Sequence, residues 1–120
     1  MRALTHRLEE IAADWRREGR VPSRAELEDL YTHGCGEVLQ LEAARARARR
    51  MMREVTLELG RDERAVERVA ALQRRELALE ERVRTVRAQV EDIRVALGLL
   101  GAADDAVDAA AHAWLDRLGV

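Results

Sequence analysis

The chain has 120 residues, of which 37% are charged and 48% hydrophobic, while only Trp15, Tyr31 and Trp114 are aromatic. Its net charge is −2, so there is no global basic field to attract nucleic acid, and the absence of lysine excludes chemistry that needs a lysine amine. The length corresponds to one domain, and a chain dominated by Ala, Arg, Glu, Leu and Val is typical of long helices and coiled coils.

Cysteine content and hydropathy indicate the compartment. Cys35 is the single cysteine, so an intramolecular disulfide is impossible and a reducing compartment is the simpler interpretation. No apolar run approaches membrane-spanning length, and the N-terminus lacks the apolar segment of a secretory signal. We therefore expect a cytoplasmic protein without a membrane partner.

Residues 1–36 are predicted to form a small helical head. Apolar residues at steps of four, three and four predict a first helix over about 3–18; they are Leu4, Leu8, Ile11 and Trp15. Gly19 is suited to end this helix. The letters SRAE then place Ser23 as N-cap with Glu26 three residues later, which predicts a capping box. The short helix that starts there is expected to end at HGCG, after about residue 31.

Two longer helices are predicted at about 37–59 and 63–98, from core positions that alternate steps of three and four. In the first helix these positions are Val38, Leu41, Arg45, Ala48, Met52, Val55 and Leu59. In the second they are Ala65, Val69, Leu72, Glu76, Leu79, Val83, Val86, Val90, Ile93 and Leu97. The two registers do not continue across Gly60, which favours a fold-back over one rod. We therefore predict an all-α fold, an antiparallel coiled-coil hairpin (37–98) with shorter N- and C-terminal helices completing a helical bundle in one domain, 1–120.

The fold-back can be tested, because facing residues of an antiparallel pair have numbers that sum to a nearly constant value. Met52 with Val69 gives 121, and the charged residues of the two stripes, Arg45 and Glu76, give the same sum. We therefore predict a half-buried Arg45–Glu76 ion pair. Such a pair contributes little net stability after desolvation, but it sets the register, because a slip would place each charge against hydrophobic groups. The alternative, a parallel dimer, would place Glu76 against its own copy.

The second long helix extends past its partner, so residues 84–100 form an apolar overhang. Two coverings are open: this chain's own N-terminal helix and a C-terminal helix within 102–120 (about 105–118, carrying Trp114), or a second protomer. From the size of this apolar surface we predict a homodimer.

Candidate catalytic and metal-binding residues are few. His6, His33, Cys35 and His112 have no partner at a recognised ligand spacing, so we expect no metal and no cofactor. Phosphate loops, nucleophile elbows and paired catalytic carboxylates are absent from the sequence. The stretch GRDERAVERVAAL after an Arg-rich helix resembles the all-helical chorismate mutases. That family's site uses a lysine, which this chain lacks, and we expect no enzymatic activity.

Nucleic-acid binding is the alternative function. GRVPSRAEL resembles the entry to bacterial helix-turn-helix units, and a helical head followed by a coiled coil is similar to KfrA-like plasmid regulators. The resemblance implies a DNA-binding regulator with a helix-turn-helix-like head over 23–53 and coiled-coil dimerisation. The candidate nucleic-acid contacts are Arg47, Arg49, Arg50 and Arg53. These scatter around the predicted helix, and the first turns from Glu37, which should touch the bases, contain no arginine.

Protein–protein interaction is the function that the sequence favours. Long amphipathic helices without catalytic motifs are suited to an adaptor, an assembly factor or a regulator, whose partner docks on an exposed helical face. The identity of that partner lies outside the sequence.

Overall fold

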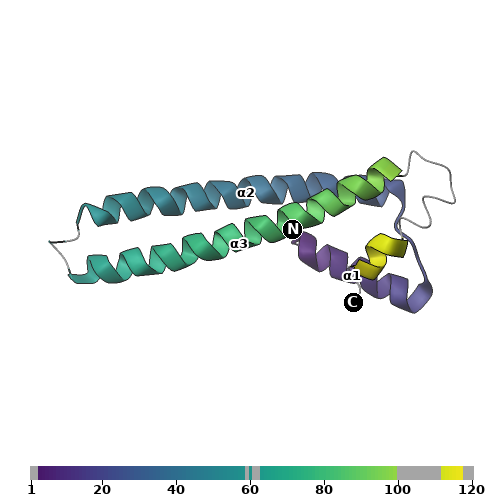
Figure 1. Ribbon diagram of the computed structural model, residues 1–120, viewed down its shortest axis with the longest axis horizontal. Coiled ribbons are helices and arrows are strands. Elements are labelled where there is room, and N and C mark those ends of the chain that lie inside the picture. Colours follow the sequence, from purple (N-terminus) through teal and green to yellow (C-terminus); the bar gives the residue numbers. More distant parts are fainter. Residues whose placement is uncertain (1–2, 59, 61–62, 100–111, 118–120) are drawn as a thin grey trace. The chain divides into compact units, whose positions relative to one another are not determined.

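The computed structural model describes residues 3–58, 60, 63–99 and 112–117. Its elements are α1 (Leu4–Glu18), α2 (Arg24–Thr56) and α3 (Glu63–Leu99), and residues 112–117 are also helical (Figure 1). No strand occurs in the described part of the chain. The long helices α2 and α3 pack against each other, so the predicted all-α hairpin fold is confirmed.

Contacts between residues divide the chain into two compact units. The head unit comprises Met1–Glu37 and Val86–Val120, and the hairpin unit comprises Val38–Thr85. Each long helix therefore contributes one end to the head unit and the other end to the hairpin unit. The expectation of a single folding domain stays a prediction.

The predicted boundaries of the first helix are confirmed. Gly19 adopts the left-handed conformation with φ of 64°, and its N–H donates to the carbonyl of Trp15 at 2.8 Å, which ends α1. Ser23 caps α2, because its hydroxyl oxygen accepts the backbone N–H of Glu26 at 3.2 Å. The carboxylate of Glu26 accepts a hydrogen bond from Arg20 at 2.7 Å.

The predicted break at HGCG is wrong, because α2 continues without interruption from Arg24 to Thr56. Gly34 serves packing instead of ending the helix. A Cβ atom at Gly34 would lie 2.6 Å from Val90 Cγ2 and 2.9 Å from Leu4 Cδ2, so the missing side chain lets α1 and α3 approach α2 closely. Nothing lies within 4 Å of the corresponding Cβ position at Gly36. The sequence analysis interpreted Gly34 as the end of a helix, whereas it is a glycine that allows close packing.

The core of the head unit consists of apolar side chains from all of its helices. Among the described residues, ten of them are buried: Leu4, Leu8, Ala12, Leu27, Leu30, Val86, Ile93, Ala96, Trp114 and Leu115. The α3 residues Val86 and Ile93 belong to the predicted overhang, and they are 1% and 0% exposed in the single chain. The chain's own helices therefore cover the overhang. This removes the observation from which a homodimer was expected, and the homodimer itself stays a prediction.

The C-terminal helix is described only over residues 112–117, where Trp114 and Leu115 are buried. The rings of Trp15 and His112 meet edge to face, with centroids 4.5 Å apart and an interplanar angle of 75°. The remainder of the predicted helix, 105–111 and 118, lies outside the described residues.

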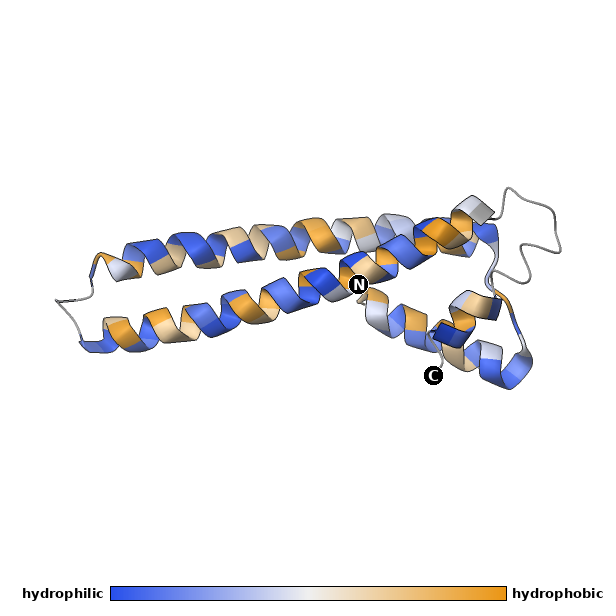
Figure 2. Cartoon of the chain, viewed as in Figure 1, coloured by the Kyte–Doolittle hydropathy of each residue, from blue (hydrophilic) through white to orange (hydrophobic). Residues whose placement is uncertain are grey.

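The hairpin unit pairs residues 38–56 of α2 with residues 63–85 of α3 (Figure 1). Apolar and polar segments alternate along both helices, as expected for helices that cover one face each (Figure 2). Helix α2 ends at Thr56, three residues before the predicted end, and the Thr56 hydroxyl donates to the Met52 carbonyl at 2.6 Å. Among the described helices, none is long and apolar enough to cross a membrane.

Candidate functional site

Arg45, Arg49 and Glu76 form an ion cluster inside the hairpin unit. Nε of Arg45 donates to Oε1 of Glu76 at 2.7 Å, and Nε of Arg49 donates to the same oxygen at 3.0 Å. The side chain of Glu76 is only 13% exposed, against 24% for Arg45 and 54% for Arg49. The structure thus brings the two predicted residues together, and it adds Arg49, which the sequence analysis assigned to possible nucleic-acid contact.

The cluster keeps Glu76 ionised. The hydrogen bond from Arg45 lowers the pKa of the Glu76 carboxyl below its ordinary value of 4.5, burial acts in the opposite direction, and Arg49 lowers it further. The negative charge therefore persists at the centre of the hairpin, where it faces two guanidinium groups. This arrangement matches a role in setting the register, and it offers no reactive group to a ligand.

Once Arg49 is assigned to Glu76, the other three arginines of the candidate set share one side of α2. Residues 47, 50 and 53 recur at steps of three, so they span an arc of about 120° on a helix with 3.6 residues per turn. The buried Ala48 lies on the opposite side of α2. All three arginines are exposed. Counting Arg49 with them widens the arc only to about 160°, because Arg49 lies one turn before Arg53, on the side of α2 nearer to Glu76.

These three arginines also form no ion pair and no side-chain hydrogen bond within the described part of the chain. Of the arginines in the described residues, five form no ion pair and no side-chain hydrogen bond: Arg47, Arg50, Arg53, Arg74 and Arg75. All five belong to the hairpin unit. In the head unit, by contrast, Arg7 bonds Asp29 at 2.6 Å and Arg24 bonds Glu28 at 3.0 Å. Three of the five unpaired guanidiniums therefore gather on one face of one helix.

Exposed apolar residues lie on the same face. We call the following set the outward stripe of α2: Leu39, Ala43, Ala46, Arg50, Arg53 and Leu57, at steps of four, three, four, three and four. Leu39 is 68% and Leu57 83% exposed. Leu57 follows the last residue of α2, but its N–H still donates to the Arg53 carbonyl at 3.3 Å, so it extends the helical path. Leu39 and Leu57 were missed by the sequence analysis, although their place opposite the core stripe could have identified them.

A groove lies at the C-terminal end of this stripe. It has a volume of about 560 Å³ and is lined by Arg50, Arg53, Glu54, Thr56 and Leu57. Two unpaired guanidiniums and one exposed leucine thus border the same depression. Such a surface can take an apolar side chain next to a carboxylate.

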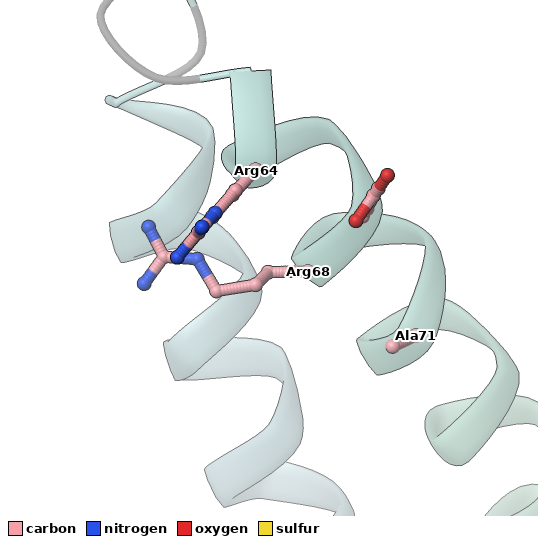
Figure 3. Close-up of a pocket in the computed structure, with 4 residues that line it drawn as sticks. Arg64, Arg68 and Ala71 are labelled. Carbon is pink, nitrogen blue, oxygen red and sulfur yellow. The ribbon is translucent and has the colours of Figure 1, made fainter.

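A second depression, on α3, has less available charge. It measures about 440 Å³ and is lined by Arg64, Glu67, Arg68 and Ala71 (Figure 3). Arg64 and Arg68 extend from α3 to the same side, and Arg68 donates to Glu58, which lies past the end of α2, at 2.9 Å. Both arginines have interaction partners within the chain. An external ligand would have to compete with these partners.

The residues considered for metal or nucleic-acid binding are not assembled into such sites. No group of three or more His, Cys, Asp or Glu side chains suited to a metal ion occurs among the described residues. His6 lies on α1 next to Glu10, with Nε2 and Oε1 3.1 Å apart. The helix-turn-helix-like head predicted over 23–53 is not formed, because α2 is continuous through that range. Arg47, Arg50 and Arg53 nevertheless stay accessible to a polyanion.

Comparison with known proteins adds no family: the chain matches no protein-family model, no curated protein and no solved structure.

Proposed function

We propose that the protein is a helical protein–protein interaction module, acting as an adaptor, assembly factor or regulator, which binds its partner through the outward stripe of α2. The observation that carries the proposal is the coincidence of two features on one helix face. Arg47, Arg50 and Arg53 have no ion pair among the described residues, and the leucines at both ends of the stripe are exposed. Exposed apolar groups beside unsatisfied charges are typical of a surface that a partner covers.

The arginine content supports the same proposal. A guanidinium group presents donors in a planar fork that matches a carboxylate, and arginine is enriched at interfaces where few residues supply most of the binding energy. The head unit is a weaker candidate, because its described arginines are paired within the chain and Val95 is the only large exposed apolar residue among its described residues.

DNA binding is the second candidate, favoured by the same three guanidiniums, which phosphate groups also match. Two features weigh against it. Only two of the six residues of the stripe are arginine, the others being alanine and leucine, and the net charge of −2 supplies no long-range attraction for a polyanion.

Site-specific photo-crosslinking tests the proposal. A photoreactive amino acid replaces Ala46 on the outward stripe, and as a matched control it replaces Ala78, an exposed alanine on α3 of the same unit. We expect the Ala46 probe, irradiated in extract of the native host, to capture a protein that the Ala78 probe does not capture. Lysine-directed crosslinkers are unsuitable, because the chain has no lysine.

The capture must also depend on the stripe itself. Adding Leu39→Ala and Leu57→Ala to the Ala46 probe should abolish it, while Arg74→Gln with Arg75→Gln should leave it intact. Equal capture from Ala46 and Ala78 would contradict the proposal. Capture of nucleic acid in place of protein would favour the DNA-binding alternative.

A further inference from the structure

We infer that the partner segment is an acidic amphipathic α-helix that lies along the outward stripe of α2. This inference rests on the proposed function and specifies the partner. Its carboxylates meet Arg50 and Arg53 on the stripe and Arg47 beside it, and its apolar side chains cover the alanines of the stripe and enter the groove beside Leu57. The stripe variant used in the test replaces all three arginines.

The spacing of the stripe fits a helix. Steps of four and three from Leu39 to Leu57 repeat the pattern by which one helix contacts another. With a rise of about 1.5 Å per residue, the stripe is about 27 Å long, which corresponds to a partner helix of about 18 residues. Ala43 and Ala46 are exposed and small, so they allow the backbone of a second helix to approach closely at the centre of the stripe.

The charge distribution favours an acidic partner. The hairpin unit contains twelve arginines against nine acidic residues, a net charge of +3, whereas the head unit has nine against fourteen, a net charge of −5. Within the hairpin, Arg45 and Arg49 already pair with Glu76, and Arg45 also lies 3.6 Å from Glu80. At residues 47, 50 and 53 three positive charges lie beside one carboxylate, that of Glu54, which lines the groove with Arg50 and Arg53. Carboxylates of a partner at helical spacing can pair with the remaining positive charge.

A second copy of this chain fits the stripe less well. Antiparallel pairing of two outward stripes about Ala48 would match Leu39 with Leu57, but it would set Arg50 against Ala46 at the centre. The carboxylates nearest to that point are Glu42, which already has an interaction within its own chain, and Glu54, which would face Glu42 of the other copy. The guanidiniums would therefore lose water for few new partners. An acidic helix removes this difficulty, because it provides the missing carboxylates.

The test uses a fluorescent peptide of three heptads with the sequence Leu-Ala-Ala-Leu-Glu-Ala-Glu, and a matched peptide with Gln in place of every Glu. The acidic flanks oppose self-association of the probe. Binding to the full chain is measured by fluorescence anisotropy at low and at high salt. A DNA duplex of mixed sequence serves as the competing polyanion, and light scattering reports the mass of the protein alone.

We expect the acidic peptide to bind the full chain about tenfold more tightly than the Gln peptide, and more weakly as salt increases. Arg47→Gln, Arg50→Gln and Arg53→Gln together should weaken binding about tenfold, since three exposed charge pairs are lost. The matched control, Arg74→Gln with Arg75→Gln, removes unpaired arginines outside the stripe and should leave the affinity unchanged. Circular dichroism verifies that both variants remain helical.

Three results would overturn the inference. They are equal binding of the two peptides, equal loss in the stripe and control variants, and tighter binding of the duplex than of the acidic peptide. A dimer that dissociates only in the stripe variant would overturn it in favour of a second copy. If Ala46 captures a protein partner but the acidic peptide fails, the proposed function stands and only the inference about the partner's charge falls. If Ala46 captures nothing, the proposed function itself fails.

Discussion

The head unit and the hairpin unit use the same helices in different ways. Of the described residues, ten buried apolar side chains belong to the head unit and only three, Ala48, Ala65 and Val83, to the hairpin unit. Large exposed apolar residues show the reverse distribution. Where the structure describes the chain, one of them is in the head unit, Val95, and five are in the hairpin unit: Leu39, Met51, Leu57, Val66 and Leu77.

The difference follows from geometry. In a two-helix hairpin each helix can cover one face of its partner, so most of its surface stays in contact with water. In the head unit, α1 and the ends of α2 and α3 enclose a common core with residues of the C-terminal helix. Most of the buried apolar core is therefore in the head unit, where several helices meet. The hairpin unit, with only two helices, leaves more helix surface exposed for binding.

The largest expected effect comes from Leu→Ala substitutions at a buried, a half-buried and an exposed position. Leu30→Ala in the head unit should lower the free energy of unfolding by about 2–5 kcal/mol, because Leu30 is 0% exposed. Leu79→Ala at the hairpin interface, where the side chain is half-buried, should reduce it less. Leu39→Ala, 68% exposed, should change it by less than about 0.5 kcal/mol. Urea unfolding measures all three, and a loss at Leu79 equal to that at Leu30 would contradict the comparison.

A second prediction concerns the ion cluster of the hairpin. Glu76→Leu should destabilise the protein more than Arg45→Leu, because it leaves Arg49 without a carboxylate and Arg45 with only its 3.6 Å contact to Glu80, whereas Glu76 without Arg45 keeps Arg49. The double variant Arg45→Leu with Glu76→Leu should be more stable than Glu76→Leu alone. Equal losses in the single and double variants would show that the pair does not set the register.

The same cluster predicts a pH dependence. The pKa of Glu76 is lower in the folded state than its ordinary value of 4.5, so its contribution to stability is present above pH 4.5 and is lost as the pH falls through the folded value. Glu76→Gln should remove this part of the acid sensitivity. Glu91 in the head unit has a pKa lowered in the same direction by Arg94, but the pair is exposed, so added salt should weaken its contribution more.

The smallest expected effect is the difference in stability between Gly→Ala substitutions at two glycines of α2. Gly34→Ala should destabilise the head unit, because overpacking against Val90 and Leu4 costs about 1–3 kcal/mol, more than alanine gains in helix propensity. Gly36→Ala has open space and should stabilise the helix by about 0.5–1 kcal/mol. Thermal unfolding distinguishes the two, and stabilisation by both substitutions would argue against close packing at Gly34.

Periodic signals in the sequence were sufficient for the hairpin. The helical period and the opposite charges of Arg45 and Glu76 predicted antiparallel packing, because both depend on residue spacing that a helix converts directly into geometry. The candidate surface was predicted only in part. Its arginines were named, but Arg49 belongs to the ion cluster, and that became visible only from its 3.0 Å contact with Glu76.

The sequence by itself determined the helical class, the start and end of the first helix, the fold-back and the position of the internal charge pair, since these follow from local periodicity and capping. Tertiary structure alone decided that α2 continues through HGCG, that the overhang of α3 is buried by the same chain, and which arginines are left without a partner. The physical reason is that Gly34, Ile93 and Arg49 acquire their roles from residues distant in the chain. A local pattern does not specify which distant side chain will lie within reach.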